Sequence, residues 1–278
     1  MTSSFPTRSQ INLTLRYASF FNSRLTLKQL HHWLISSHTS SISQLEKTLS
    51  SHPQLKKKLI PNIPPKQKKI YKQKMSSLKS FLSFLKFFPT IRFVGLTGSL
   101  AILNSTPEDD IDLLIVTSPH TLWLTRLLLF PFLLFFNHRR PGKLHRPNDL
   151  CLNLWIDQSN LVLPSSKQNL YTAHELLQMK PLLDRGQTYS DFISSNSWVS
   201  QHLANAYHVQ TSSLPSPKPN PFKVLNLFSL ILSPLNLLAY LTQRIYMSPK
   251  ITTETVTLFQ AYFHPKDFSS DLHSHLHL

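Results

Sequence analysis

Residues 91–117 read IRFVGLTGSLAILNSTPEDDIDLLIVT, and their pattern is the strongest indication of the fold. Both of its ends, residues 91–97 and 111–117, are rich in apolar and β-branched side chains, which is typical of buried strands. A Gly-Ser pair follows the first strand, and a run of acidic residues leads into the second. The stretch therefore predicts two strands of a sheet, with polar groups gathered where the first ends and the second begins.

The acidic residues around the start of the second strand are crowded: four of the thirteen Asp and Glu residues of the chain lie between positions 108 and 112. Asp110 and Asp112 are two residues apart, so both carboxylates project from one face of the strand. Crowded carboxylates repel one another unless a cation relieves the repulsion. Because oxygen ligands suit Mg²⁺ or Mn²⁺, we predict that Asp110 and Asp112 bind a divalent metal ion and are catalytic.

Gly98 and Ser99 stand where the first strand ends. Glycine has no side chain to block a phosphate group, and serine offers a hydroxyl and a backbone N–H to phosphate oxygens. A Gly-Ser pair alone carries no information, but this one is flanked by strands and followed, after ten residues, by the paired aspartates. Gly98 and Ser99 are therefore predicted to bind the phosphates of a nucleoside triphosphate.

These residues resemble the DNA polymerase β-like nucleotidyltransferase superfamily, whose motif is Gly-Ser or Gly-Gly, a spacer, and then Asp-hydrophobic-Asp on a strand. More broadly, residues 15–265 resemble a group of bacterial proteins that joins a helical, winged-helix-like start to such a core, in segments that include LTGSLA, DDIDLLIVT, CLNLWID and YTAHELLQMKPL. The resemblance implies an α/β (α+β) fold with a small mixed sheet. It also implies metal-dependent transfer of a nucleoside monophosphate from a nucleoside triphosphate to a hydroxyl, without identifying the acceptor.

The third metal position departs from the pattern of the family, which usually places another carboxylate on a later strand. Residues 150–156 predict that strand, and Asn153 lies where the acid is expected. By alternation, Asp149 and Asp157 share its face. Asparagine can bind a metal ion through its oxygen but cannot act as a base, so Asn153 is predicted as a ligand. Glu175, in a helical segment, is the candidate catalytic base; the alternative, slightly favoured, is an exposed helix acid.

A basic loop is predicted at residues 137–148. Its Arg139 and Arg140 are candidates for binding the triphosphate, because arginine contacts phosphate oxygens in a bidentate manner. A solvated basic loop without a ligand is an equally good interpretation.

The whole chain divides into three predicted parts. Residues 1–75 form a basic, helical, winged-helix-like module, in which apolar residues recur at helical spacing over 11–50. A Lys- and Pro-rich segment, 52–74, is either a linker or a degenerate wing leading into a basic helix. A plain helical hairpin is the alternative for this module. Residues 76–210 form the nucleotidyltransferase core, and residues 211–278 contain a linker, an apolar helix and a tail.

Further helices are predicted at residues 78–88, 122–136 and over most of 169–207. The longest apolar stretch, 222–247, is interrupted by Asn and Ser residues and by Pro234. A helix that is buried on the domain or lies at a membrane surface is therefore favoured over a transmembrane helix.

The formal net charge of +16 favours polyanionic partners: nucleoside triphosphates, nucleic acid or, less favoured, an anionic membrane surface. The single cysteine excludes an internal disulfide, and residues 1–10 do not resemble a signal peptide, so we expect a cytoplasmic protein. The predicted function is that of a metal-dependent nucleotidyltransferase. The alternative is a catalytically inactive protein of the same fold that binds nucleic acid as a regulator through its basic N-terminal half.

Overall fold

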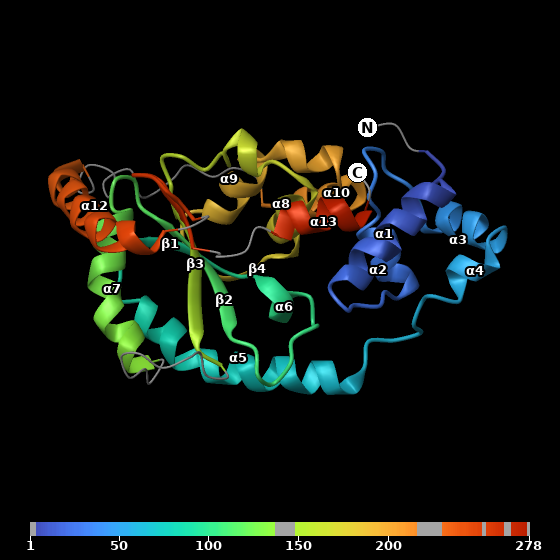
Figure 1. The fold of residues 1–278 in the computed structure, drawn as a ribbon, viewed down its shortest axis with the longest axis horizontal. Coiled ribbons are helices and arrows are strands. Elements are labelled where there is room, and N and C mark those ends of the chain that lie inside the picture. The colour runs from blue at the N-terminus through green and yellow to red at the C-terminus, as the bar shows by residue number, and fades with distance from the viewer. Residues whose placement is uncertain (1–3, 137–147, 216–229, 252–253, 264–267, 277–278) are drawn as a thin grey trace.

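A six-stranded mixed sheet forms the centre of the structure, a computed structural model that describes residues 4–136, 148–215, 230–251, 254–263 and 268–276 (Figure 1). The strand order is β4-β1-β2-β3-β6-β5. β2 and β3 run parallel, and every other neighbouring pair is antiparallel. The strands are β1 (Ile91–Leu96), β2 (Ile111–Thr117), β3 (Leu150–Asp157), β4 (Lys180–Asp184), β5 (Thr255–Val256) and β6 (Gln260–Tyr262).

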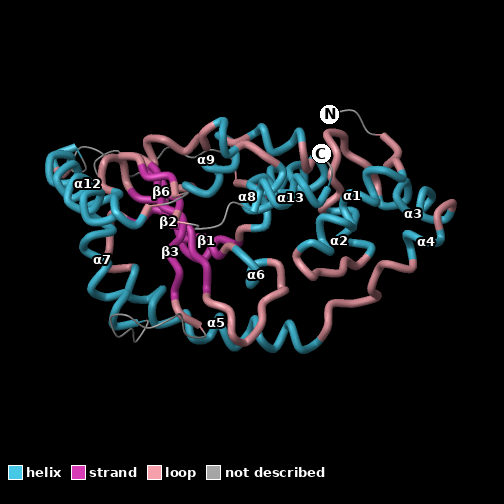
Figure 2. The backbone as a smooth tube through the Cα atoms, in the orientation of Figure 1, coloured by secondary structure: helices cyan, strands magenta, loops and turns pink. Residues whose placement is uncertain are grey.

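The described residues also form twelve α-helices, so the fold is mixed α/β. They are α1 (Arg8–Phe20), α2 (Leu27–His32), α3 (Ile42–Ser50), α4 (Pro53–Lys56), α5 (Pro65–Leu85), α6 (Gly98–Ala101), α7 (Leu122–Phe136), α8 (Leu170–Gln178), α9 (Thr188–Ser195), α10 (Ala204–Ser212), α12 (Ser233–Met247) and α13 (Phe268–Leu276). Helices α7 and α12 lie beside the sheet, whereas α3 and α4 lie at the far end of the molecule (Figure 2).

Different helices cover the two faces of the sheet. Ile111 and Leu113 of β2 pack in a hydrophobic cluster with residues of α5, α7 and α12. Leu114 packs in a second cluster with residues of α1, α8, α9 and α10. Because side chains alternate along a strand, Asp110 and Asp112 are directed to this second face. The predicted metal ligands therefore lie on the side of the sheet that α8 covers.

The predictions for the elements next to the motif are confirmed. β1, β2 and β3 lie where the sequence predicted strands, and α7 forms as a single helix although it contains Pro131. The N-terminal helices also form as expected. Thr26 caps α2 by accepting a hydrogen bond from the backbone N–H of Gln29, which satisfies an N–H that has no partner within the helix.

Residues 52–74 are not a linker throughout, because α5 begins at Pro65. A proline is tolerated in the first turn of a helix, where its missing N–H has no intrahelical role. Ile70 and Leu78 lie on the buried face of the helix. Packing of this apolar face stabilises the helix although its exposed faces are polar. The predicted domain boundary at residue 75 falls inside this continuous helix.

Residues 169–207 are mostly helical, as predicted, but one strand interrupts them. Lys180–Asp184 form β4, which pairs antiparallel with β1, and the short strands β5 and β6 extend the other side of the sheet. Residues 4–90 contain no β-strand, and Ser36 forms an isolated bridge with Leu203. They show no hairpin of the kind that a wing would form, so the winged-helix interpretation stays a prediction.

The described part of the apolar C-terminal segment, α12, packs against α7. Asn236 Oδ1 accepts hydrogen bonds from the backbone N–H groups of Trp123 and Leu124 at 2.8 and 3.1 Å. It therefore caps the first turn of α7 from a distant part of the chain. None of the described helices combines the length and the apolar character needed to cross a membrane. Residues 216–229 lie outside the described residues.

Candidate metal and nucleotide site

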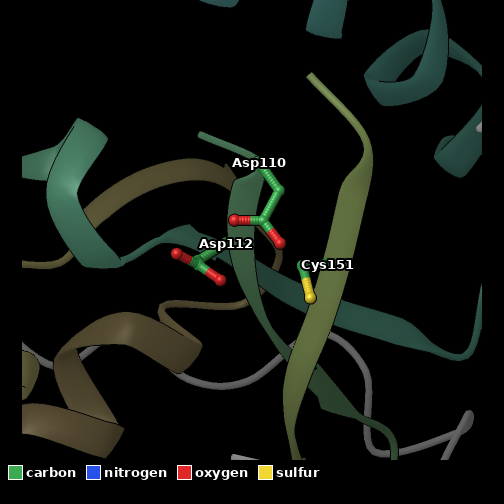
Figure 3. A group of neighbouring side chains, drawn as sticks. All are labelled: Asp110, Asp112 and Cys151. Carbon is green, nitrogen blue, oxygen red and sulfur yellow. The ribbon is translucent and has the colours of Figure 1, made fainter. Parts of the chain in front are cut away.

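Two aspartates and a cysteine meet where β2 and β3 begin. Asp112 is the register partner of Cys151 on the neighbouring parallel strand. The ligand atoms of Asp110, Asp112 and Cys151 all lie within 4.8 Å of one another (Figure 3). This group is a possible metal-binding cluster, and it contains both aspartates that the sequence predicted as ligands.

Asn153 lies beside this cluster and bonds to two of its members. Its Nδ2 donates a hydrogen bond to Asp112 Oδ1 at 2.6 Å, and its Oδ1 accepts one from the Cys151 thiol at 2.9 Å. The amide nitrogen of Asn153, and not its oxygen, therefore contacts the Asp112 carboxylate. The thiol of Cys151 lies next to the two aspartates. Ligation of a metal ion through the oxygen of Asn153, as predicted, would require the amide to turn over.

The electrostatics of the cluster favour a bound cation. Burial and the charges of Asp110 and Asp109 raise the pKa of Asp112 to about 7, against the opposing hydrogen bond from Asn153. Burial and the neighbouring aspartates likewise raise the pKa of Cys151 to about 12, so its thiol is protonated at neutral pH. A cation between the carboxylates would offset the repulsion that raises these pKa values.

The position of the Asp112 carboxylate requires a glycine at residue 98. The backbone of Gly98 is in the left-handed region, with φ of 66°, where glycine meets no steric penalty. A Cβ atom at this position would lie 2.3 Å from Asp112 Oδ2. The absence of a side chain therefore allows the Asp112 carboxylate to lie directly against the backbone at the start of α6.

The acidic loop before β2 is held from two sides. The ammonium group of the buried Lys74, on α5, donates hydrogen bonds to the backbone carbonyls of Pro107 and Asp109. The Asp109 carboxylate accepts from the Thr106 backbone N–H at 2.9 Å and from Ser99 Oγ at 3.0 Å. Asp109 thus fixes the loop to α6 and engages the hydroxyl proton of Ser99.

Glu175, on α8, lines the same cavity as Asp112, one of the candidate metal ligands. The cavity has a volume of about 730 Å³, and Gly98, Ser99, Asp112 and Glu175 line part of it. Burial, followed by the charge of Asp112, raises the pKa of Glu175 to about 7. The side chain is only partly exposed, so it is not the exposed helix acid that the sequence slightly favoured.

The N-terminal helices close the other side of this cavity. Phe21, Trp33 and Tyr171 line it with aromatic rings. Lys180, on β4, also lines the cavity, and its Nζ lies 4.5 Å from the centre of the Tyr71 ring. The module predicted at residues 1–75 therefore contributes directly to the walls of the candidate site.

The structure brings together the predicted site residues that it describes. Arg139 and Arg140 lie outside the described residues. Sequence reasoning missed Cys151, although strand alternation places it on the same face as Asn153. It also missed Lys180, because no signal separated the short strand β4 from the helices on either side. The site residues placed in this region are Gly98, Ser99, Asp110, Asp112, Asn153 and Glu175.

No family model, curated protein or solved structure matches the chain. The geometry and electrostatics of the site therefore carry the functional argument.

The raised carboxylate pKa values predict how stability depends on pH without metal. The folded-state values of about 7 for Asp112 and Glu175 exceed the ordinary values of 3.8 and 4.5, so the folded protein binds these protons more tightly than the unfolded chain. The free energy of unfolding should therefore fall as pH rises from about 4 to about 7, by at most about 1.4 kcal/mol per pH unit for each group.

Urea unfolding at several pH values in EDTA measures this slope. Glu175→Gln should reduce it, because the variant has no titrating group at that position. Glu46→Gln, which changes an exposed glutamate on α3, should leave it unchanged. An unaltered slope in Glu175→Gln would show that burial does not raise the pKa of Glu175.

Proposed function

We propose that the protein is a metal-dependent nucleotidyltransferase, related to the DNA polymerase β-like superfamily, that transfers a nucleoside monophosphate to an acceptor hydroxyl. The observation that carries the proposal is the contact between Gly98 and Asp112. A glycine with left-handed backbone geometry lies against a carboxylate of the candidate metal cluster, at the wall of a cavity of about 730 Å³. Gly98, Ser99 and Asp112 of the motif thus line the same cavity.

Two of the three residues in the candidate cluster are suitable ligands for a hard divalent cation. Asp110 and Asp112 offer the carboxylate oxygens that Mg²⁺ and Mn²⁺ prefer, whereas a protonated thiol at Cys151 is a poor ligand for Mg²⁺. When bound, the ion would supply charge neutralisation for the triphosphate and the leaving pyrophosphate. Substrate phosphates and water commonly complete such a coordination sphere, so a third protein carboxylate is not required for binding.

Glu175 has the position and the proton affinity of a general base. A pKa of about 7 places it close to the neutral pH at which a base is most effective. In the proposed step, the acceptor oxygen bonds to the α-phosphorus while the bond from that phosphorus to the pyrophosphate oxygen breaks. The hydroxyl proton passes to Glu175, and pyrophosphate leaves. Lys180, at the same cavity, provides a positive charge for the phosphates.

Transfer of labelled nucleotide tests the proposal. The protein is incubated with each of the four nucleoside triphosphates, labelled at the α-phosphate, together with Mg²⁺ or Mn²⁺ and a cell extract. We expect label in an acceptor and release of pyrophosphate, both abolished by EDTA. If neither occurs with any nucleotide or metal, the enzymatic assignment is contradicted.

One observation favours a second function, that of a nucleic-acid-binding regulator. Seven exposed lysines follow one another along α4, the segment after it and the first half of α5, with no acidic residue between them. A row of this kind attracts a phosphate backbone without reading its sequence. These lysines are Lys56, Lys57, Lys58, Lys66, Lys68, Lys69 and Lys72.

If this row binds nucleic acid, affinity should depend steeply on salt. A protein with six to ten phosphate contacts loses about 10³–10⁵-fold in affinity between about 50 and 200 mM salt. Gel-shift titrations of the full chain on a DNA duplex measure this slope. Replacing three lysines of α5 with glutamine should weaken binding and reduce the dependence of affinity on salt. Both effects should be larger than those of removing three positive charges elsewhere on the surface. The test variant changes Lys66, Lys68 and Lys69; the control changes the exposed Arg8, Lys28 and Lys47.

Binding that is absent at low salt, or equal in the two triple variants, would contradict a role for this row. The result separates the two functions, because none of these lysines lines the cavity of the candidate active site.

A further inference from the structure

The outer faces of α7 and α12 form a large exposed apolar surface. Among the described residues, fourteen of the nineteen exposed large apolar side chains lie at positions 127–135 or 230–246. Several are more than half exposed, including Leu128 at 55%, Phe135 at 71% and Ile245 at 75%. Both helices lie at the end of the molecule opposite α3 and α4 (Figure 1). Contiguous apolar patches of this kind mark sites of interaction rather than ordinary surface.

The orientation of α12 is the reverse of that expected for a helix facing water. Its polar Asn236 is buried and caps α7, and Gln243 donates to the backbone carbonyl of Trp123 at 2.9 Å. The exposed face carries Leu238 and Ile245 instead, at 59% and 75% exposure. A helix that turns Asn236 and Gln243 inward and most of its leucines outward is suited to an apolar medium.

The surface continues from α7 onto the end of α5. The Phe84 ring packs on the Phe132 ring, with centroids 4.6 Å apart, and Phe87 is 82% exposed close by in the chain. Lys86, which lies between Phe84 and Phe87 in the sequence, is also exposed. The apolar surface therefore spans parts of three helices and has a lysine at its α5 end.

The segments that form this surface contain cationic residues but no acidic ones. The sequence contains no Asp or Glu from residue 113 to 148 or from 192 to 253. Both helices of the surface lie within these two acid-free segments. Lys86 and Arg244 are exposed on its helices, and the whole chain carries a formal net charge of +16. An occupant of complementary chemistry must be apolar and negatively charged at its boundary.

We propose that the outer faces of α7, α12 and the end of α5 bind the surface of an anionic lipid membrane. Acyl chains would receive the leucine and phenylalanine side chains, and anionic headgroups would attract the cationic residues around them. A second copy of this chain fits less well, because it would bring two acid-free, cationic regions together without opposite charge. The inference is independent of the proposed nucleotidyl transfer, since none of these surface residues lines the catalytic cavity.

Sedimentation of the full chain with vesicles tests this proposal. We expect the protein to sediment with vesicles of phosphatidylcholine and phosphatidylserine, much less with phosphatidylcholine alone, and less as salt screens the charges. The Leu128→Asp, Ile245→Asp double variant should bind at least about tenfold more weakly, because two exposed apolar anchors become charged. Val209→Asp, which changes a 53% exposed valine on α10, should bind like the unaltered protein.

Sedimentation velocity without lipid completes the test. A monomer that binds anionic vesicles through Leu128 and Ile245 supports the proposal. Two results would overturn it: equal vesicle binding by the double variant and the unaltered protein, or no vesicle binding at all. A dimer that the double variant dissociates, combined with absent vesicle binding, would assign the surface to a second copy of the chain.

Discussion

Replacing Asp112 with asparagine should reduce nucleotidyl transfer by at least about 10³-fold, because a metal ion supplies several kcal/mol of charge stabilisation and each 1.36 kcal/mol is a factor of ten. Asp110→Asn should have a similar effect, since both carboxylates belong to the same candidate cluster. Steady-state transfer of labelled nucleotide measures the loss.

The fold should survive this substitution. Burial and neighbouring charge raise the pKa of Asp112, so the carboxylate is unfavourable in the metal-free protein, and a neutral amide should not lower its thermal stability in EDTA. Glu108→Gln is the matched control, because Glu108 belongs to the same acidic run but is exposed. An Asp112→Asn variant with more than a tenth of the original activity would contradict the metal-ligand role.

Gly98→Ala should reduce transfer by about 10²-fold, the scale of loss that follows a misplacement of about 1 Å in an active site. The new Cβ would lie 2.3 Å from Asp112 Oδ2, so the carboxylate or the start of α6 must move. The left-handed backbone, with φ of 66°, should add a stability loss of about 1 kcal/mol. Turnover and urea unfolding measure the two effects separately.

Gly186→Ala distinguishes the steric effect from the backbone effect. Gly186 also has a left-handed backbone, with φ of 68°. It follows β4, whereas Gly98 follows β1, and because these two strands are antiparallel the two glycines lie at opposite ends of the strand pair. Replacement of Gly186 should cost stability without the same loss of turnover. If Gly98→Ala keeps full activity, the close approach of Asp112 to the glycine is not needed for catalysis.

The parts of the fold that the sequence predicted are those with strong local signals. β1 and β2 are rich in apolar and β-branched residues, so the two strands and the shared face of Asp110 and Asp112 could be predicted from local patterns. β4 has five residues and pairs with β1 across a long separation in sequence. Its formation depends on tertiary contacts that no local pattern reports. Lysines and prolines likewise concealed where α5 begins, although its second half was predicted as a helix.

The candidate site was predictable to a similar extent. The Gly-Ser and aspartate pairs could be identified from spacing, and the structure places them together. The positions of Cys151 and Lys180 depend on how β3 and β4 align with their neighbours in the sheet. The role of Asn236 as a cap for α7 depends on a contact between residues 113 positions apart. Such details arise from packing between distant segments.

Binding tests more directly than turnover whether Asp110 and Asp112 hold the metal ion that accompanies a nucleotide. Paramagnetic resonance of Mn²⁺ titrated with the full chain and a non-hydrolysable nucleoside triphosphate analogue counts the bound ions. We expect one tight, nucleotide-dependent site in the unaltered protein and in Glu108→Gln, and none in the Asp110→Asn, Asp112→Asn double variant. Equal nucleotide-dependent Mn²⁺ binding by the double variant and the unaltered protein would show that Asp110 and Asp112 do not hold the ion.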